Sequence, residues 1–244
     1  MIKKATLIVL FITASFSANA QNWWGNSKKI KGNGNVVTVK RTTSNYDGIA
    51  VGGSFDVILI KGKEGTITIE GEENIIPLIE TEVSGNTLQI KYQKNTNIST
   101  TKRLTITVTY NDLEKISIGG SGNITSEDII KSNDLSVSLG GSGNITLHVD
   151  ADDLSVNIGG SGNVKLSGKS DDLSCSIAGS GSIKAYDLTT DTLNASIAGS
   201  GSIKITVSTK IKAKVVGSGS VYYKGNPSKV DAKSVGSGEV VDKN

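Results

Sequence analysis

The chain of 244 residues contains one cysteine, one histidine and two prolines, together with three phenylalanines, two tryptophans and six tyrosines. A single cysteine forms no internal disulfide, so noncovalent packing alone must hold the fold together. Cys175 stands where neighbouring repeats carry Val137, Val156 or Ala195, and the only histidine, His148, falls at an outward or corner position of another repeat. We therefore interpret Cys175 as a small buried residue and exclude a Cys–His catalytic pair.

Long apolar runs are also missing. The longest, residues 5–16, is shorter than the ~20 residues that a membrane-spanning helix needs. Lys3 and Lys4 precede it, and Ala18-Asn19-Ala20 follows it as a small-residue cleavage site, which predicts a signal peptide over residues 1–20. We expect a soluble protein that is secreted across the inner membrane and stays periplasmic or reaches the cell surface or the extracellular space. No cysteine follows the cleavage site to carry a lipid anchor.

Residues 21–35 contain Trp23 and Trp24 and are rich in Gly, Asn and Lys. We expect a flexible N-terminal tail here, because such segments bury little and order poorly. The tryptophans then serve in docking, or they fold back on the apolar end of the molecule, and the sequence leaves this open.

No strong excess of charge is present, since the formal net charge of +3 includes Lys3 and Lys4 of the signal peptide. Nucleic acid is therefore not an expected partner. The charge is nevertheless uneven, with five lysines and twelve acidic residues in 111–202 but eight lysines and three acidic residues in 203–244. The C-terminal lysines either meet an anionic glycan or membrane surface or form a solvated, edge-protecting set. Seven of these eight lysines form the set considered, namely Lys204, Lys210, Lys212, Lys214, Lys224, Lys229 and Lys233.

What the sequence has in abundance is glycine, 29 residues, and Gly-Ser-Gly recurs with a period near twenty. The first glycines of these motifs are at 120, 141, 160, 179, 199, 217 and 236. Between motifs, apolar and polar residues alternate, as in Leu154-Val156-Ile158, which is typical of half-buried strands. One such coil has no core of its own, so coils must stack. Residues 112–244 are therefore predicted to form an all-β, parallel β-helix solenoid of about seven Gly-Ser-Gly coils.

Two other uses of the glycines are excluded by spacing. Calcium-binding nonapeptide rolls repeat a G-G-x-G-x-D motif every nine residues, whereas "GGSGNI" contains no Asp and these motifs recur about every twenty residues. Nucleotide-binding loops lead from a strand into a helix, whereas these motifs lead into another strand. The glycines are therefore structural.

Residues 36–111 alternate without a period and are predicted to be a strand-rich N-terminal cap region, with a hairpin around Ser84-Gly85-Asn86. Such a region would cover the open edge of the first coil. At the other end, Ser234 stands where earlier coils have Ile or Leu, and charges interrupt the pattern. We expect this polar end to discourage end-to-end stacking.

The run "YDGIAVGGSFDVILIKGKEGTITIEGEENIIPLIETEVSGNTLQIKY", then "LTITVTYNDLEKISIGGSGNI" and the "AGSGSI" copies, resembles the putative auto-transporter adhesin, head GIN domain family of secreted Bacteroidetes-type proteins. The resemblance covers roughly residues 45–225. It implies a right-handed, single-stranded β-helix preceded by a β region. No catalytic residue, cofactor or ligand comes with it.

Aligned repeats place aspartates in two columns at the start of the alternating strand. Neighbouring carboxylates would lie about 5 Å apart and repel by roughly 1 kcal/mol. Either they begin turns and are solvated, or they form a weak Ca²⁺ ladder, the only cofactor considered. The columns comprise Asp112, Asp134, Asp153 and Asp172, and Asn133, Asp152, Asp171 and Asp191.

The outward positions of the same strands carry short hydroxyl and amide side chains. They are Ser136, Ser138, Ser155, Asn157, Ser174, Ser176, Asn194 and Ser196, followed by Lys212 and Lys214. Such a face either binds a glycan or an extracellular protein or is simply a polar exterior, and few aromatics are available to stack on sugars.

A non-enzymatic, adhesin-like surface module is the function that we predict. The alternative is a structural cell-envelope protein without a dedicated ligand. A polysaccharide-active enzyme is disfavoured, because Arg41 and Arg103 lie outside the coils and no insertion forms a cleft.

Overall fold

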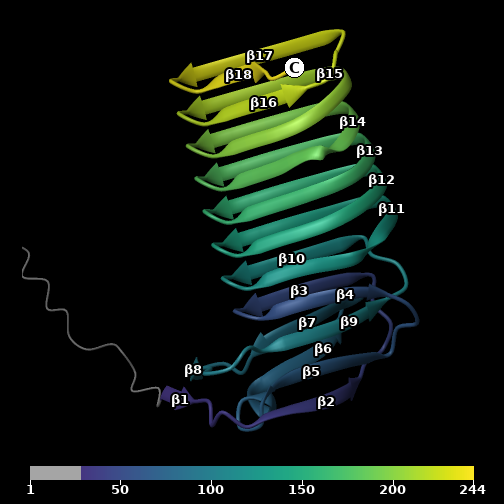
Figure 1. Cartoon of the computed structure of the whole chain (residues 1–244), viewed down its shortest axis with the longest axis vertical. Coiled ribbons are helices and arrows are strands. Elements are labelled where there is room, and N and C mark those ends of the chain that lie inside the picture. Colours follow the sequence, from purple (N-terminus) through teal and green to yellow (C-terminus); the bar gives the residue numbers. More distant parts are fainter. Residues whose placement is uncertain (1–28) are drawn as a thin grey trace, which may run out of the picture.

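The computed structural model describes residues 29–244, which are built almost entirely from β-strands. Figure 1 shows them as coils stacked along one axis, a β-solenoid of about seven turns. Within this part of the chain the only helical element is the 3₁₀ turn η1, Ile76–Leu78. The predicted all-β solenoid is therefore confirmed. The predicted signal peptide, Trp23 and Trp24 lie outside the described residues.

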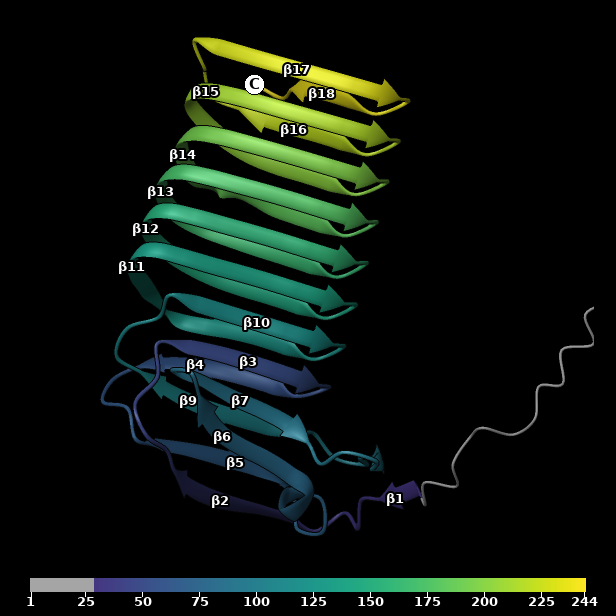
Figure 2. The same cartoon turned by 180° about the vertical axis from the view of Figure 1, so that it is seen from behind.

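Each coil contributes to two facing sheets, as the opposite views in Figures 1 and 2 show. Figure 1 shows the ribbon of each long strand bending from one sheet into the other. In β12, two successive exposed residues, Asp152 and Asp153, interrupt the alternation of buried and exposed positions, as a bend of the strand requires. Successive coils pair in parallel over nearly their whole length. The long strands are β11 (Asn123–Gly141), β12 (Asn144–Gly160), β13 (Asn163–Gly179), β14 (Ser182–Gly199) and β15 (Ser202–Gly217).

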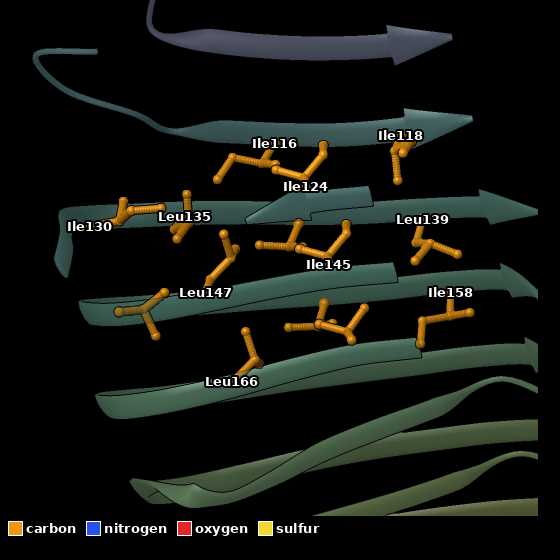
Figure 3. Packing of buried hydrophobic residues seen from close by; sticks show 14 of the residues in the cluster. Ile116, Ile118, Ile124, Ile130, Leu135, Leu139, Ile145, Leu147, Ile158 and Leu166 are labelled. Atoms are coloured by element: carbon orange, nitrogen blue, oxygen red, sulfur yellow. The ribbon is translucent and has the colours of Figure 1, made fainter. Parts of the chain in front are cut away.

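The core is the space between the two sheets, filled by the inward side chains of stacked coils. Figure 3 shows this packing, in which Ile118, Leu139 and Ile158 follow one another in register, as do Ile124 and Ile145. All five are at most 3% exposed. Each apolar side chain is thus covered by its counterparts in the coils above and below, which one coil alone does not provide.

The Gly-Ser-Gly motifs form the tight corners between coils. At one of them, Gly160 has φ +124°, a conformation that L-residues with a side chain rarely adopt. The carbonyl oxygen of Gly141 in the preceding coil accepts hydrogen bonds from the backbone N–H groups of Ser161 (2.9 Å) and Gly162 (3.1 Å). A Cβ on Gly160 would lie 2.5 Å from that oxygen, so the corner needs both the conformation and the small size of glycine.

The stack begins earlier than residue 112. Strands β3 (Gly48–Gly53) and β4 (Asp56–Lys61) form one more coil, which pairs in parallel with β10 (Lys115–Gly120) and with the first part of β11. Its corner reads Gly53-Ser54-Phe55, with Phe55 where later motifs have glycine. Phe55 is fully buried, and its ring centroid lies 4.5 Å from that of Tyr92. The predicted cap of residues 36–111 therefore includes a solenoid coil that lacks the motif.

The remaining N-terminal strands continue both sheets and close this end. β7 pairs in parallel with β3, and β6 pairs antiparallel with β7 through the predicted hairpin at Gly85-Asn86. On the other sheet β9 pairs in parallel with β4, and β5 and β2 follow in antiparallel order. The bounds are β2 (Val36–Thr42), β5 (Thr66–Glu72), β6 (Ile79–Ser84), β7 (Thr87–Tyr92) and β9 (Thr105–Tyr110).

A buried carboxylate ties the outermost loops to this end. Glu72 is 1% exposed, and its carboxylate accepts hydrogen bonds from the backbone N–H groups of Gly34 (2.7 Å) and Thr101 (2.8 Å) and from the Thr101 hydroxyl (2.6 Å). The hydrogen bond from that hydroxyl is the largest cause that lowers the pKa of Glu72 to about 2. Nearby, β1 (Lys29–Lys31) pairs in parallel with β8 (Asn97–Ser99). The prediction of a flexible tail is therefore wrong for residues 29–35, which Glu72 and β8 hold in place. The rest of the predicted tail, residues 21–28, lies outside the described residues.

The C-terminal coil is less covered. It consists of β17 (Lys229–Gly236), which pairs with β15, and β18 (Glu239–Asp242), which pairs with β16 (Ser220–Lys224). Val230 is 42% exposed although it follows the buried Ile211 in register, because no coil lies beyond it in the described chain. Ser234 follows Val215, as the sequence pattern predicted.

We expect Gly160→Ala to lower the free energy of unfolding by about 2–5 kcal/mol, since backbone strain and the clash with Gly141 add. Gly159→Ala is the matched control, because no atom lies within 4 Å of a Cβ there and the next coil carries Ala178 in register. Urea denaturation of both variants measures the difference. Equal stability of the two would contradict the proposed role of the corner glycine.

The low pKa of Glu72 predicts pH-dependent stability. Because the folded pKa of about 2 lies below the ordinary value of 4.5, the unfolded chain binds more protons between these values, and stability rises with pH there. The contribution of Glu72 should be complete above pH 4.5 and lost as the pH falls towards 2. Glu72→Gln should flatten this part of the profile, whereas Glu70→Gln, at an exposed position two residues earlier, should not. Thermal melts across this pH range test it.

Candidate functional site

The predicted outward residues lie together on one sheet, which we call the serine–asparagine face. Parallel register places Ser136, Ser155, Ser174 and Asn194 in one column. It places Ser138, Asn157, Ser176 and Ser196 in a second. All eight side chains are exposed or half-buried. Lys212 and Lys214 continue the two columns into the next coil.

The serine–asparagine face carries only short side chains along its four central coils. A third outward column beside it consists of Gly140, Gly159, Ala178 and Ala198, so no large side chain rises along this edge. The depression between the central serines and asparagines has a volume of about 160 Å³, below the ~300 Å³ at which pockets for small-molecule ligands begin. Larger depressions, of about 340 and 380 Å³, lie where the face meets Lys210, Lys212 and Lys214.

The aspartates predicted to form columns do so in part. Asp134, Asp153 and Asp172 stand in register at the bend between the sheets, and Thr192 and Lys210 end their column. Asp152, Asp171 and Asp191 occupy the exposed neighbouring positions, and the Asp191 carboxylate accepts a 2.7 Å hydrogen bond from the Ser208 hydroxyl. Asp112 precedes β10 outside the paired strands, and its carboxylate lies 3.5 Å from Lys61 Nζ. It therefore does not extend the column in register.

These carboxylates do not converge as a coordination shell. In residues 29–244, no three or more acidic, histidine or cysteine side chains form a group that could hold a metal ion. A column on a parallel sheet sets its members side by side at about 5 Å, whereas a Ca²⁺ ion needs six to eight oxygens around one point. The calcium ladder therefore stays a prediction, in which water molecules would have to supply most of the oxygen ligands of each ion.

The C-terminal lysines predicted to form one basic end lie on both sheets. Lys212 and Lys214 project from the sheet of the serine–asparagine face, with Lys233 following Lys214 in register. Lys204 and Lys224 belong to the opposite sheet. Sequence order placed these residues close together but could not say on which face each would lie.

Sequence reasoning missed a lysine column on that opposite sheet. Lys165, Lys184 and Lys204 follow one another in register, and Tyr222 comes next. Lys224 Nζ lies 5.0 Å from the ring centroid of Tyr186, and Lys243 Nζ lies 5.4 Å from that of Tyr222. Each lysine of the column comes three residues after a Gly-Ser-Gly motif, so an alignment of the repeats at that position would have revealed the column.

A ladder of amides was also missed. The side-chain amide of Asn163 donates to Asn144 Oδ1 (3.1 Å), and that of Asn144 donates to Asn123 Oδ1 (2.9 Å). At its end the Asn123 amide donates to Asp56, whose second oxygen accepts from Arg103 Nε at 2.6 Å. The three asparagines each follow a Gly-Ser-Gly motif directly, which is the signal that could have identified them. The ladder links the side chains of neighbouring coils and helps to hold the coils in register.

Cys175 and His148 do not form a reactive pair. Cys175 is buried in the core, and burial raises the pKa of its thiol to about 12, so the thiolate is not populated near neutral pH. The side chain of His148 is exposed. The interpretation of Cys175 as a small core residue is confirmed.

The family described as "Putative auto-transporter adhesin, head GIN domain" matches residues 45–227, three quarters of the sequence, and the chain belongs to this family. No curated protein matches it. None of the helical structure in residues 29–244 has the length and apolarity needed to cross a membrane.

Solved structures share the fold across almost their whole length. A putative adhesin from Bacteroides fragilis is 27% identical, with a TM-score of 0.82 over 88% of this chain and 100% of its own. A putative lipid binding protein from Parabacteroides distasonis is 28% identical, with a TM-score of 0.75 over 89% and 100%. A putative adhesin from Parabacteroides merdae, at 24% identity and a TM-score of 0.70 over 88% and 99%, is similar in fold.

The aspartate column gives a test of calcium binding. If its carboxylates are only solvated, Asp153→Asn should raise the free energy of unfolding by roughly 0.2–1 kcal/mol in low salt, because it removes two like-charge contacts. The gain should shrink as salt screens the charges. Asp187→Asn, at an exposed position opposite Ser167, should change little.

The same variants are then melted with millimolar Ca²⁺. An unchanged melting temperature of the unsubstituted protein would end the calcium hypothesis. A calcium-induced rise that Asp153→Asn abolishes would instead support it.

Proposed function

We propose that this protein is an adhesin-like binding module without enzymatic activity, which presents the serine–asparagine face to an extended glycan or protein ligand. The observation that carries the proposal is the strict register of this face. Four successive coils offer the same short hydroxyl and amide groups at the coil spacing of about 4.8 Å, over a surface without bulky side chains. A repeating ligand can therefore meet equivalent groups at each coil.

The relatives support a binding role and a location outside the cytoplasm. Two of the similar structures are described as putative adhesins and one as a putative lipid binding protein, and none of these descriptions names a reaction. All three come from Bacteroides or Parabacteroides. Together with the predicted signal peptide, they favour export to the cell envelope, at the surface or in the periplasm.

The chemistry of the coils favours binding over catalysis. The only thiol, Cys175, is buried, and both arginines belong to the N-terminal region, where Arg41 donates to the carbonyls of Ile76 and Ile79 and Arg103 to Asp56. The acidic columns stand at an exposed bend. Hydrolases and lyases of polysaccharides need an acid paired with a base or metal in a cleft that encloses the substrate.

A structural role in the envelope, without a dedicated ligand, is the alternative. A solenoid with a closed N-terminal end and continuous parallel pairing is a stiff rod whatever its faces bind. The two proposals differ only in whether a lateral face has a partner, so a binding assay separates them.

A glycan and extracellular-protein array, probed with labelled protein with and without Ca²⁺, is the direct test. We expect that ligands bound by the unsubstituted protein are no longer bound when Ser155, Ser174 and Ser196 are changed together to glutamate, because large charged side chains then project from the face. The melting temperature should fall only slightly, because these side chains point outward and the cost is limited to repulsion between exposed charges in neighbouring coils. The matched control changes Thr125, Thr146 and His148, exposed on the opposite sheet, to glutamate. Binding that survives the first set and not the second would move the site to the other sheet.

A further inference from the structure

A pocket of about 580 Å³, lined by polar and charged residues, lies at the side of the N-terminal coil, and its volume is within the range of small-ligand pockets. Four loops line it: the segment before β3, the segment after β4, the β6–β7 turn, and the segment between β9 and β10. These loops lie on the side of Figure 1 where β3 begins and β4 ends. We call it the cap-loop pocket, and its lining residues are Asn45, Tyr46, Asp47, Lys63, Glu64, Asn86, Asn111 and Asp112.

The loops of the cap-loop pocket are held in place by their own hydrogen bonds. The Glu64 carboxylate accepts from the backbone N–H groups of Tyr46 (3.1 Å) and Asn111 (3.0 Å), so one side chain joins three loops. The Tyr46 hydroxyl donates to the carbonyl of Thr109 at 2.7 Å, and burial with the nearby Glu64 charge raises its pKa, which keeps it a neutral donor. The Asn86 carbonyl accepts from the backbone N–H of Asp47 at 3.0 Å. A ligand therefore meets a largely preformed site.

Two amide–carboxylate pairs face this pocket. The Asn86 side-chain amide donates to Asp47 Oδ2 at 3.2 Å, and that of Asn111 donates to Asp112 Oδ2 at 2.6 Å. The Asn86–Asp47 pair keeps an amide oxygen, a second amide hydrogen and a second carboxylate oxygen for a ligand. The Asn111–Asp112 pair keeps an amide oxygen and a second amide hydrogen, while Asp112 Oδ1 lies 3.5 Å from Lys61 Nζ. Donors and acceptors thus stand side by side in fixed positions. A sugar hydroxyl both donates and accepts, and adjacent hydroxyls of a sugar ring match such paired groups.

The charge of the pocket selects among sugars. The pocket has three carboxylates, those of Asp47, Glu64 and Asp112, and only two nearby ammonium groups, those of Lys63 and of Lys61 beside Asp112. The net charge is therefore negative, and it repels a phosphate, sulfate or uronate but not a neutral hydroxyl group.

We propose that the cap-loop pocket binds one neutral sugar residue, such as the end of a glycan chain. This inference rests on the proposed function in one respect, because it also takes a glycan as the ligand. It does not depend on the serine–asparagine face. It assigns to four non-repeating loops a site that the repeats do not contain.

Saturation-transfer and chemical-shift NMR with neutral methyl hexosides and methyl N-acetylhexosaminides, in a buffer with EDTA, test the proposal. We expect millimolar binding of at least one of these sugars and no binding of glucuronate. The double variant Asn111→Ala/Asp112→Ala removes one amide–carboxylate pair but keeps the backbone N–H of Asn111 for Glu64, and it should weaken binding about tenfold or more. Asn226→Ala, at an exposed position near the C-terminal end, is the matched control and should bind normally.

Absence of binding by every neutral sugar, equal affinity of the double variant, or binding that requires Ca²⁺ would each overturn the assignment. The change of Ser155, Ser174 and Ser196 to glutamate separates the two proposals. If it abolishes array binding while the hexoside still binds, both sites stand. If the double variant binds the hexoside normally while the array result holds, only the cap-loop pocket is refuted.

Discussion

The close stacking of glycine corners is the constraint on which this structure depends. At each corner a carbonyl of one coil accepts N–H groups of the next at about 3 Å, as between Gly141 and Ser161, with no room for a Cβ between them. This approach sets the distance between coils, and the parallel pairing then keeps it along both sheets. The apolar core follows, because the inward side chains of neighbouring coils can touch only at this spacing.

The same spacing determines what the outer faces can do. Because register is strict, any outward position becomes a column, so single residues of the repeat are multiplied into serine, aspartate or lysine rows. Columns of like charge carry a cost that columns of small polar groups do not. The acidic rows stand at the exposed bend, where water screens their repulsion, while the middle of one sheet carries serine and asparagine.

Local and periodic features were predictable from the sequence, and contacts between distant segments were not. The period of Gly-Ser-Gly and the alternation around Leu154 predicted the coils, their inward residues and the alignment of Ser155 with Ser174. The coil of β3 and β4 escaped because Phe55 replaces the last glycine of its motif and 67 residues separate Asp56 from its partner Asn123. Glu72, which holds Gly34 and Thr101, and Glu64, which joins three cap loops, depend on long-range contacts with no periodic signal.

Repetition and selectivity also place opposite demands on a binding protein. A face that repeats the same groups at every coil gains avidity, since each added contact is already held near its ligand, but it treats all similar polymers nearly alike. Discrimination needs donors and acceptors that occur once, in fixed positions, and a charge that rejects competitors. In this molecule such groups are found where the period breaks down, among the cap loops around Glu64. Selective recognition should therefore reside at the N-terminal end of the rod, and the coils would add contact length to it.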